Sequence, residues 1–224
     1  MIEYTLVRSK RKTISIIVRE GVVIVRAPLW GSQTEIDKIV TSKEKWIRGK
    51  LFASQEQSEQ KELFSLDYNS EVVLRGSKYL IVLRDGTHAG FDGKHFYMPG
   101  GLGNEQIKDV CIKIYRRVAK EHLLTRVALY TKLIGVQPSS VKINGAKTRW
   151  GSCSARKSIN FSWRLIMADD EVIDYVVVHE LAHIIQMNHS KKFWDVVESV
   201  LPDYRERKAR LHELQKRLVR EDWG

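Results

Sequence analysis

The pattern of apolar and polar positions predicts a β-rich N-terminal part. Residues 14–26, ISIIVREGVVIVR, are read as a β-hairpin, because apolar residues alternate before Glu20-Gly21, which supplies the turn. Pro28 is predicted to end the second strand. Residues 63–97 alternate short apolar strands with turns that carry Gly and Asp. We therefore expect small antiparallel pieces of sheet in this part of the chain.

One helix is predicted within that part. Thr34 fits its N-cap, and the helical spacing of apolar residues continues to about Lys50. The positions expected on its buried side are Ile36, Ile39, Val40, Trp46, Ile47 and Leu51.

The PGGLGN stretch at residues 99–104 is the best candidate for a domain boundary, since Pro and three Gly interrupt both periodicities. A long helix is predicted after it, from Glu105 to about Ile134, with Gly135 placed to end it. Two strands follow, at 148–153 and 159–165. The fold class is thus α+β, with a β-rich N-terminal domain over residues 1–100 and a helical domain with a small sheet over 104–224.

The segment VVVHELAHIIQMNHSKKFW, residues 176–194, places three histidines and a glutamate in an apolar run. Acidic residues at 169–171 suit the start of a helix that would carry His179, Glu180 and His183. In such a helix the two histidines lie about 40° apart around the axis and about 6 Å along it, so both imidazoles can reach one tetrahedral metal ion. Glu180 lies to the side of this pair, where it can contact a water on the metal.

His189 shares that ion only if the helix ends before it. In a continuous helix it would lie about 9 Å beyond His183 and off its face. We expect Asn188 to permit the turn, because Asn tolerates the left-handed conformation that ends helices. Ser190 then fits the N-cap of a new helix, whose Phe193 and Trp194 can pack beneath the site.

These residues allow other interpretations. Histidines on an apolar helix face are often structural, and the H-E-x-x-H spacing alone occurs by chance. The helix break and the third histidine favour the metal site. Carboxylates further along the chain are rival third ligands, but they lie among Lys and Arg that offer ordinary ion pairs: Glu198, Asp203 and Glu206. The remaining histidines are expected in loops or on charged helix surfaces: His88, His95, His122 and His212. Cys111 and Cys153 have no paired-ligand spacing and are expected to be reduced thiols.

Three protein ligands leave a fourth position for water, which is typical of a catalytic rather than a structural zinc. Zinc lowers the pKa of a bound water to about 7, and Glu180 can take its proton as general base. The reaction we expect is hydrolysis of a peptide bond. The strand at Arg149–Ser154 is a candidate edge for an extended substrate, with Gly151 allowing close approach, although Trp150 could equally serve only to pack the domain.

The chain of 224 residues has a net charge of +11, which favours anionic partners without specifying them. Residues 101–150 carry ten Lys or Arg against three acids, and four cations fall within two helical turns at Lys113, Arg116, Arg117 and Lys120. A nucleotide or nucleic acid could bind there if this surface borders the metal site; otherwise it is a solvated helix face. No phosphate-binding glycine motif is present.

No apolar run approaches the ~18 residues of a membrane span. The basic cluster follows the first apolar residues, which is the wrong order for a secretory signal, so a cytoplasmic location and no membrane partner are expected. The sequence does not specify an oligomeric state.

Residues 147–207 closely resemble the YgjP-like metallohydrolase family, relatives of the SprT-like and WLM zinc proteases. The motifs are R-W-G-S-C-S, I-N-x-x-W-R-L, V-x-H-E-L-A-H and N-H-S-x-x-F-W, and the N-terminal R-S-K-R-K-T-I-S-I is also similar. The resemblance implies a zincin-like domain, zinc ligation by His179, His183 and His189, and Glu180 as the catalytic acid/base. Ala168-Asp169-Asp170 departs from the pattern, where Pro is expected at the helix entry.

Two other functions are compatible with the sequence. A metal-dependent nucleoside triphosphate pyrophosphatase activity is also associated with this family, and it would use the same metal and water. A non-catalytic, nucleic-acid-associated zinc-binding protein would use the basic region instead, but it would have no need of Glu180. Hydrolysis of polypeptide is the preferred interpretation, because no carboxylate cluster is present to hold the Mg²⁺ that a triphosphate normally brings.

Overall fold

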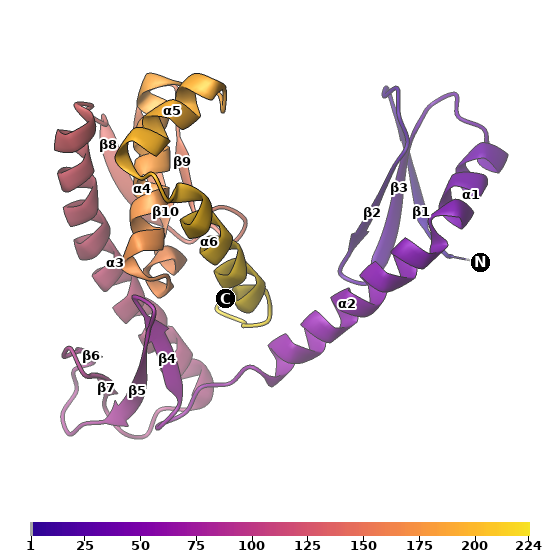
Figure 1. Cartoon of the computed structure of the whole chain (residues 1–224). Helices are drawn as coiled ribbons and strands as arrows, with labels where there is room; N and C mark the ends of the chain where they lie inside the picture. Colours follow the sequence, from indigo (N-terminus) through magenta and orange to yellow (C-terminus); the bar gives the residue numbers. More distant parts are fainter. Residues whose placement is uncertain (1) are drawn as a thin grey trace. The chain divides into compact units, whose positions relative to one another are not determined.

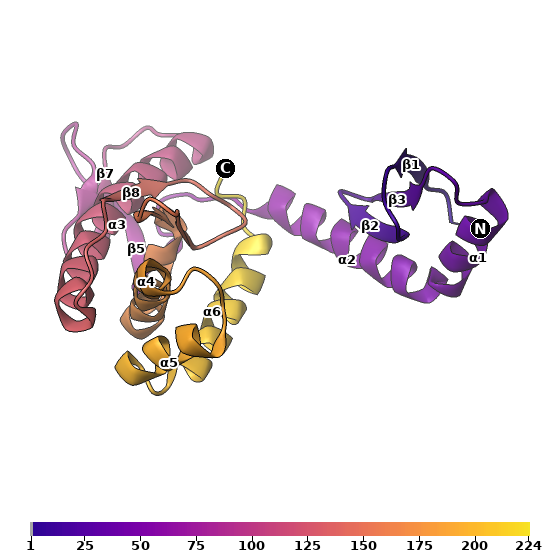
Figure 2. The same ribbon diagram turned by 90° about the horizontal axis from the view of Figure 1, so that it is seen from above.

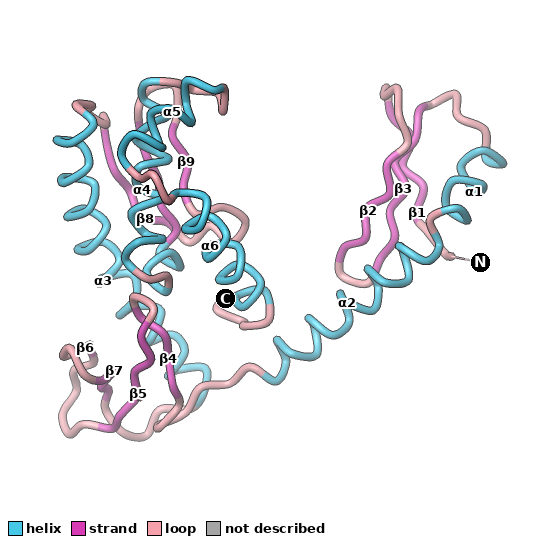
Figure 3. Tube along the Cα trace, viewed as in Figure 1, coloured by secondary structure: helices cyan, strands magenta, loops and turns pink. Residues whose placement is uncertain are grey.

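The chain has a mixed α+β fold. The computed structural model describes residues 2–224, which contain six α-helices, one 3₁₀ helix and three small mixed β-sheets (Figures 1 and 3). Contacts divide the chain into two compact units. One unit runs up to Phe64 and also takes in Val219–Asp222 and Gly224, and the other comprises Ser65–Leu218 and Trp223. Over residues 2–224, none of the helices is both long enough and apolar enough to cross a membrane.

The first unit contains a three-stranded sheet in the order β1-β3-β2. Its strands are β1 (Thr5–Ser9), β2 (Ser15–Arg19) and β3 (Val22–Pro28). The predicted hairpin is confirmed as β2 and β3, which pair antiparallel around Glu20 and Gly21, both with positive φ (51° and 75°). β1 was not predicted. It pairs parallel with β3, and its short alternation could not be told from that of a loop.

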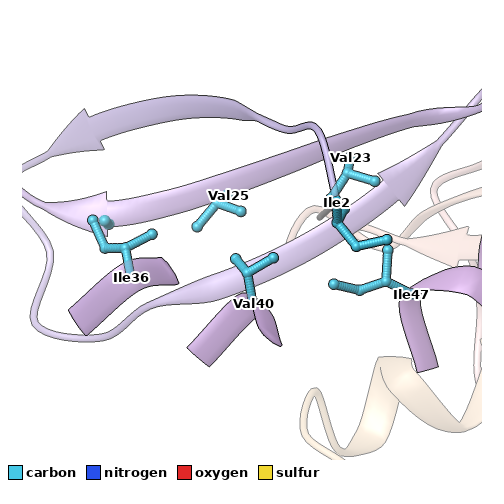
Figure 4. Close-up of a cluster of buried hydrophobic side chains, with 7 residues drawn as sticks. Ile2, Val23, Val25, Ile36, Val40 and Ile47 are labelled. Carbon is cyan, nitrogen blue, oxygen red and sulfur yellow. The ribbon is translucent and has the colours of Figure 1, made fainter. Parts of the chain in front are cut away.

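Two helices follow in this unit, where one was predicted. They are α1 (Gln33–Ser42) and α2 (Glu44–Leu63), separated at Lys43. The N-cap is Ser32 rather than Thr34, since the Ser32 hydroxyl accepts a hydrogen bond from the Glu35 amide. Side chains from the helices point toward the sheet and form its core, as Figure 4 shows for Ile36, Val40 and Ile47 against Val23 and Val25. Five of the six positions predicted on the buried side are buried or partly buried, but Trp46 is 46% exposed and the ends of the predicted helix are wrong.

The second unit begins with a four-stranded sheet in the order β4-β5-β7-β6. Its strands are β4 (Glu71–Leu74), β5 (Ser77–Leu83), β6 (Gly90–Phe91) and β7 (His95–Met98). Helix α3 (Asn104–Ile134) packs against this sheet and ends at Gly135, which is left-handed as predicted (φ 74°). The Tyr115 hydroxyl donates to the Val73 carbonyl at 2.8 Å, and its ring lies 5.2 Å from that of Phe96.

These contacts place the sheet of β4–β7 in the same unit as α3. The division between compact units therefore falls at Phe64 and Ser65, before β4, whereas the boundary expected from the sequence lies after β7, at residues 100–104. The glycines at 100–103 form a turn between two elements of one unit, and local sequence cannot distinguish such a turn from a linker. Independently folding domains over 1–100 and 104–224 stay a prediction.

A third sheet has the order β8-β10-β9. Its strands are β8 (Ser140–Asn144), β9 (Gly151–Cys153) and β10 (Ser158–Ser162). The strand predicted at 159–165 is correct only to Ser162, because Trp163–Met167 form a 3₁₀ helix in which every residue is buried. Arg164 explains the change. Its guanidinium donates hydrogen bonds to the carbonyls of Gly145 and Trp223. This polar side chain can therefore be buried and does not have to lie on the solvent-exposed face of a strand.

Helix α4 (Asp170–Ile185) lies at the centre of the second unit, between α3 on one side and α5 and α6 on the other (Figures 1 and 2). Asp169 caps it by accepting a hydrogen bond from the Val172 amide at 3.0 Å, as the acidic start of the segment predicts. The two helices that follow are α5 (Lys191–Val200) and α6 (Tyr204–Val219). Because α4 is buried along most of its length, polar side chains on it are held in fixed positions.

Candidate metal centre

Three imidazoles converge at the C-terminal end of α4. His179 and His183 lie on adjacent turns of the helix, and His189 lies in the loop after it. The three ring centroids are 4.8 to 5.0 Å apart, and the Nε2 atoms of His179 and His189 are separated by 3.1 Å. The structure therefore brings together the three histidines predicted as ligands.

The chain turns back between His183 and His189 as expected, but not by the expected means. α4 ends at Ile185, and Gln186 is extended (φ −139°, ψ 105°). Asn188 is not left-handed. Instead its side-chain oxygen accepts hydrogen bonds from Gln186 Nε2 at 2.7 Å and from the Ser190 amide at 3.3 Å. Asn188 therefore acts through its side chain, by bridging the end of one helix and the start of the next.

Aromatic side chains support the three imidazoles. The ring of Phe193 lies 4.6 to 4.9 Å from each of the three histidine rings, and Phe193 is fully buried. Trp194 stacks on His189 with centroids 5.8 Å apart. Both residues come from the first turn of α5, which confirms the packing predicted for that helix. The loop that carries His189 is thus held from below by a rigid apolar layer.

The histidines on α4 are uncharged near neutral pH. Burial, reinforced by the neighbouring imidazoles, lowers the pKa of His179 to about 3. Burial also lowers the pKa of His183, whose Nδ1 lies 3.2 Å from the Gln186 carbonyl. A hydrogen bond donated from Nδ1 leaves Nε2 of His183 with a free lone pair, which is how ligating histidines are oriented.

The donor set suits a zinc ion. One nitrogen from each histidine lies within 4.8 Å of the other two. Two nitrogens bound to tetrahedral zinc at ~2.0–2.1 Å are about 3.4 Å apart, so the arrangement needs only a small adjustment to hold the ion. Over residues 2–224, these histidines form the one group of three or more His, Cys, Asp or Glu that could hold a metal. Two of the rival ligands are in ion pairs instead, Glu198 with Arg205 and Asp203 with Arg207.

Glu180 lies beside the histidines and is 5% exposed. Burial raises the pKa of its carboxyl to about 7. Its Oε2 is buried and has no hydrogen-bond partner within the described part of the chain. Gly151 of β9 approaches it so closely that a Cβ on Gly151 would lie 2.6 Å from Glu180 Cγ and Oε1. The carboxyl is therefore held against the backbone of β9.

A pocket of about 330 Å³ opens over these groups. It is lined by the three histidines, by Glu180, by Met187 and by the whole of β9. The pocket thus joins the candidate metal centre to one strand from a distant part of the sequence. Cys153 belongs to the strand predicted as the substrate edge, whereas Met187 was not predicted at the site. The two cysteines are unpaired, as expected.

Within residues 2–224, strand β9 pairs with β10 alone, so it forms an open edge of its sheet. The Trp150 carbonyl accepts from the Ser162 amide, and the Ser154 amide donates to the Ser158 carbonyl. Residues alternate in direction along a strand, so the N–H and C=O groups of Gly151 and Cys153 point away from β10, toward the open edge. The predicted edge therefore exists, and it lies at the pocket that holds His179.

The basic surface of α3 is separate from this pocket. Lys113, Arg116, Arg117 and Lys120 are exposed, and none of them lines the pocket of the histidines. These cations are therefore not part of the wall around the histidines, as a role at the metal site would require.

Comparison with known proteins identifies a family that the chain matches. The model of the YgjP-like family, described as a metallopeptidase domain, matches residues 12–214. No curated protein matches the chain. Two crystal structures of metallopeptidase zymogens are weakly similar. Pyrococcus abyssi abylysin has 25% identity and a TM-score of 0.39, and the match covers 44% of this chain and 97% of that one. Methanocaldococcus jannaschii jannalysin has 20% identity and a TM-score of 0.37, with coverage of 41% and 94%.

Scores this low add no weight to the assignment, which rests on the family model. That model spans both units and includes the histidines, Glu180 and the edge strand β9. The chain belongs to the YgjP-like family of metallopeptidase domains.

Proposed function

We propose that this protein is a zinc-dependent peptidase in which His179, His183 and His189 hold the metal and Glu180 is the general base. The observation that carries the proposal is the position of Glu180. It lies between the three converging imidazoles and the open edge of β9, and it lines the same pocket as both. A purely structural metal site would not need a buried carboxyl with this access.

The histidines provide a neutral, nitrogen-only donor set, which suits zinc better than magnesium or calcium. Bound there, zinc would supply a Lewis acid that polarises the peptide carbonyl and lowers the pKa of water to about 7. The layer formed by Phe193 and Trp194 keeps the imidazoles in place and excludes solvent from their lower side.

Glu180 moves the protons. With a pKa raised to about 7 by burial, its carboxyl can both accept and release a proton near neutral pH. It takes a proton from the attacking water and passes it to the amine that leaves when the peptide bond breaks. The close approach of Gly151 fixes the carboxyl, so the proton is exchanged at a defined place beside the scissile bond.

The edge of β9 holds the substrate. An extended peptide can add to this edge through main-chain hydrogen bonds to Gly151 and Cys153, which is a recognition mode independent of peptide sequence. The absence of a side chain at Gly151 lets the peptide backbone approach Glu180. Polypeptide is therefore the substrate class that this geometry favours.

The same arrangement gives less support to a triphosphate substrate. Such a substrate is normally bound with Mg²⁺ through carboxylates and with several Lys or Arg. Glu180 is the one carboxylate lining the histidine pocket within residues 2–224, and the cations of α3 do not line it. Nucleic-acid binding by the basic surface would be a separate property of the protein.

A parallel turnover assay tests the proposal. Purified protein is incubated with unfolded casein and with nucleoside triphosphates, after chelation and again after addition of one equivalent of zinc. We expect zinc-dependent cleavage of the polypeptide and no release of pyrophosphate. Glu121→Gln, an exposed carboxylate on α3, is a matched control for Glu180→Gln and should be fully active. Zinc-dependent pyrophosphate release that exceeds peptide cleavage would overturn the proposal.

A further inference from the structure

A second cavity, of about 150 Å³, adjoins the histidine pocket. The two cavities share Gly151, His179 and Glu180, so they meet at the general base. Besides these shared residues, the second cavity is lined by Trp150, Tyr175, Val176 and Leu211. These four residues come from the chain before β9, from α4 one turn ahead of His179, and from α6.

The walls of this cavity are apolar. Glu180 is its one carboxylate, and neither Lys nor Arg is among its lining residues within the described chain. Burial, together with the nearby Tyr204 and Glu180, raises the pKa of Tyr175 to about 12, so its phenol stays neutral. The cavity therefore offers a neutral, largely aromatic surface directly beside the site of proton transfer.

The floor of the cavity is rigid. Tyr175 is 4% exposed, its ring meets that of His179 edge-on at 5.8 Å, and it stacks on Tyr204 at 6.4 Å. Tyr204 in turn stacks on Trp194 at 5.2 Å. This row of aromatic rings fixes the floor to the same layer that supports the histidines. Leu211 is only half-buried, and it forms the wall on α6.

The volume suits one large apolar side chain. An apolar cavity of about 150 Å³ accommodates a benzene ring, which is the size of a phenylalanine side chain. A peptide added to the edge of β9 passes over Gly151, where the two cavities meet. A side chain that enters the apolar cavity therefore belongs to a residue that flanks the bond facing Glu180.

We propose that this cavity is the specificity subsite of the peptidase, and that it selects a bulky apolar residue such as Phe, Leu or Met next to the scissile bond. This inference rests on the proposed function. Burying such a side chain removes apolar surface from water, whereas an acidic residue would lose its hydration beside the Glu180 carboxyl without gaining a partner. We therefore expect a preference of about 10- to 100-fold in kcat/KM for Phe or Leu over Ala, and a larger one over Asp.

The test uses the zinc-loaded protein and neutral peptides that differ at one position only, with cleavage sites read by mass spectrometry. Cleavage next to Phe, Leu or Met supports the proposal. Leu211→Trp, which fills the cavity, should reduce cleavage of the Phe peptide at least about 10-fold more than it reduces cleavage of the Ala peptide. Leu129→Trp, at a 48% exposed position of α3 that does not line the cavity, is the matched control and should change neither rate.

Leu211→Ala provides a second variant if Leu211→Trp is unstable. It enlarges the cavity and should shift the preference from Leu toward Trp. The proposal is overturned if the wild type cleaves the peptides without preference for an apolar residue, or if both Leu211 variants keep the wild-type preference. If the zinc-loaded wild type cleaves none of the peptides or casein, the proposed peptidase function itself fails. The two failures are therefore distinguishable.

Discussion

His179 and His189 are ten residues apart in the sequence, yet their Nε2 atoms lie 3.1 Å from each other. This proximity requires α4 to end at Ile185 and the chain to reverse through the Asn188 bridge. The pair is therefore a property of the helix end and not of the H-E-x-x-H spacing alone.

We expect the purified protein to hold about one zinc ion per molecule by elemental analysis. His183→Ala should lose most of it, since one of three ligands is removed. His212→Ala, an exposed histidine on α6, should retain all of it. Full zinc retention after replacement of all three converging histidines by Ala would contradict the metal site.

Asn188→Ala should weaken zinc binding without removing a ligand. The substitution deletes the hydrogen bonds that hold the turn in place. The loop of the variant must therefore lose more conformational entropy than the wild-type loop when His189 binds the ion. We expect an increase in Kd of about 10-fold, measured by competition with a fluorescent chelator. An unchanged Kd would mean that the turn is fixed by Phe193 and α5 alone.

Replacement of Glu180 by Gln should lower turnover by at least about 100-fold, because proton transfer is lost. Zinc content should be unchanged, since the carboxyl is a base and not a ligand in this proposal. Loss of zinc in this variant would assign Glu180 to coordination instead.

The same carboxyl predicts how the stability of chelator-treated protein depends on pH. Its pKa is about 7 in the folded chain, raised by burial from an ordinary value of 4.5. Below pH 4.5 the group is protonated in both the folded and the unfolded chain and has no effect. Above pH 7 the folded chain must hold a buried carboxylate, so the free energy of unfolding falls across this interval, by at most about 3 kcal/mol.

Glu180→Gln removes that dependence. In urea denaturation with chelator present, the variant should be more stable than the wild type at pH 8 and nearly equal to it at pH 4.5. If the difference in stability between the variant and the wild type is the same at pH 8 and at pH 4.5, burial does not disfavour the ionised form of this carboxyl.

Gly151→Ala should abolish most activity while leaving zinc content intact. The added methyl group would lie 2.6 Å from Glu180, so the carboxyl or the strand must move. We expect a loss of about 100-fold in kcat/KM, since small displacements of a catalytic group have large effects. Gly49→Ala is the control, because a Cβ there meets no atom within 4 Å. Activity within a few-fold of the wild type in Gly151→Ala would contradict the close packing of Glu180 against β9.

The convergence of the three histidines could be predicted from the sequence more completely than the surface around them. His179, His183 and His189 are close in the chain, so helical geometry and one turn determine their separation. Even there, the sequence indicated the wrong role for Asn188, because a side-chain bridge and a left-handed backbone are favoured by the same residue type. Leu211 reaches the second cavity from α6, far away in the sequence, and no periodicity marks it.

The N-terminal elements show a similar limit. The β2–β3 hairpin was predictable because its turn is local, whereas β1 depends on parallel pairing with β3, a contact between distant residues. The division of contacts at Phe64 could not be predicted for the same reason. It depends on the packing of Tyr115 against β4 and β7, and not on the composition of the connecting segment.

The short span of residues 179–189 also bears on the order of events when the chain folds. The ion can be captured once one helix end and one turn have formed, and such local structure forms early. β9 reaches Glu180 only within its sheet, whose parallel β8–β10 pairing joins residues more distant in the sequence. Under the proposed function, a newly made chain would therefore bind its metal before it could bind a substrate.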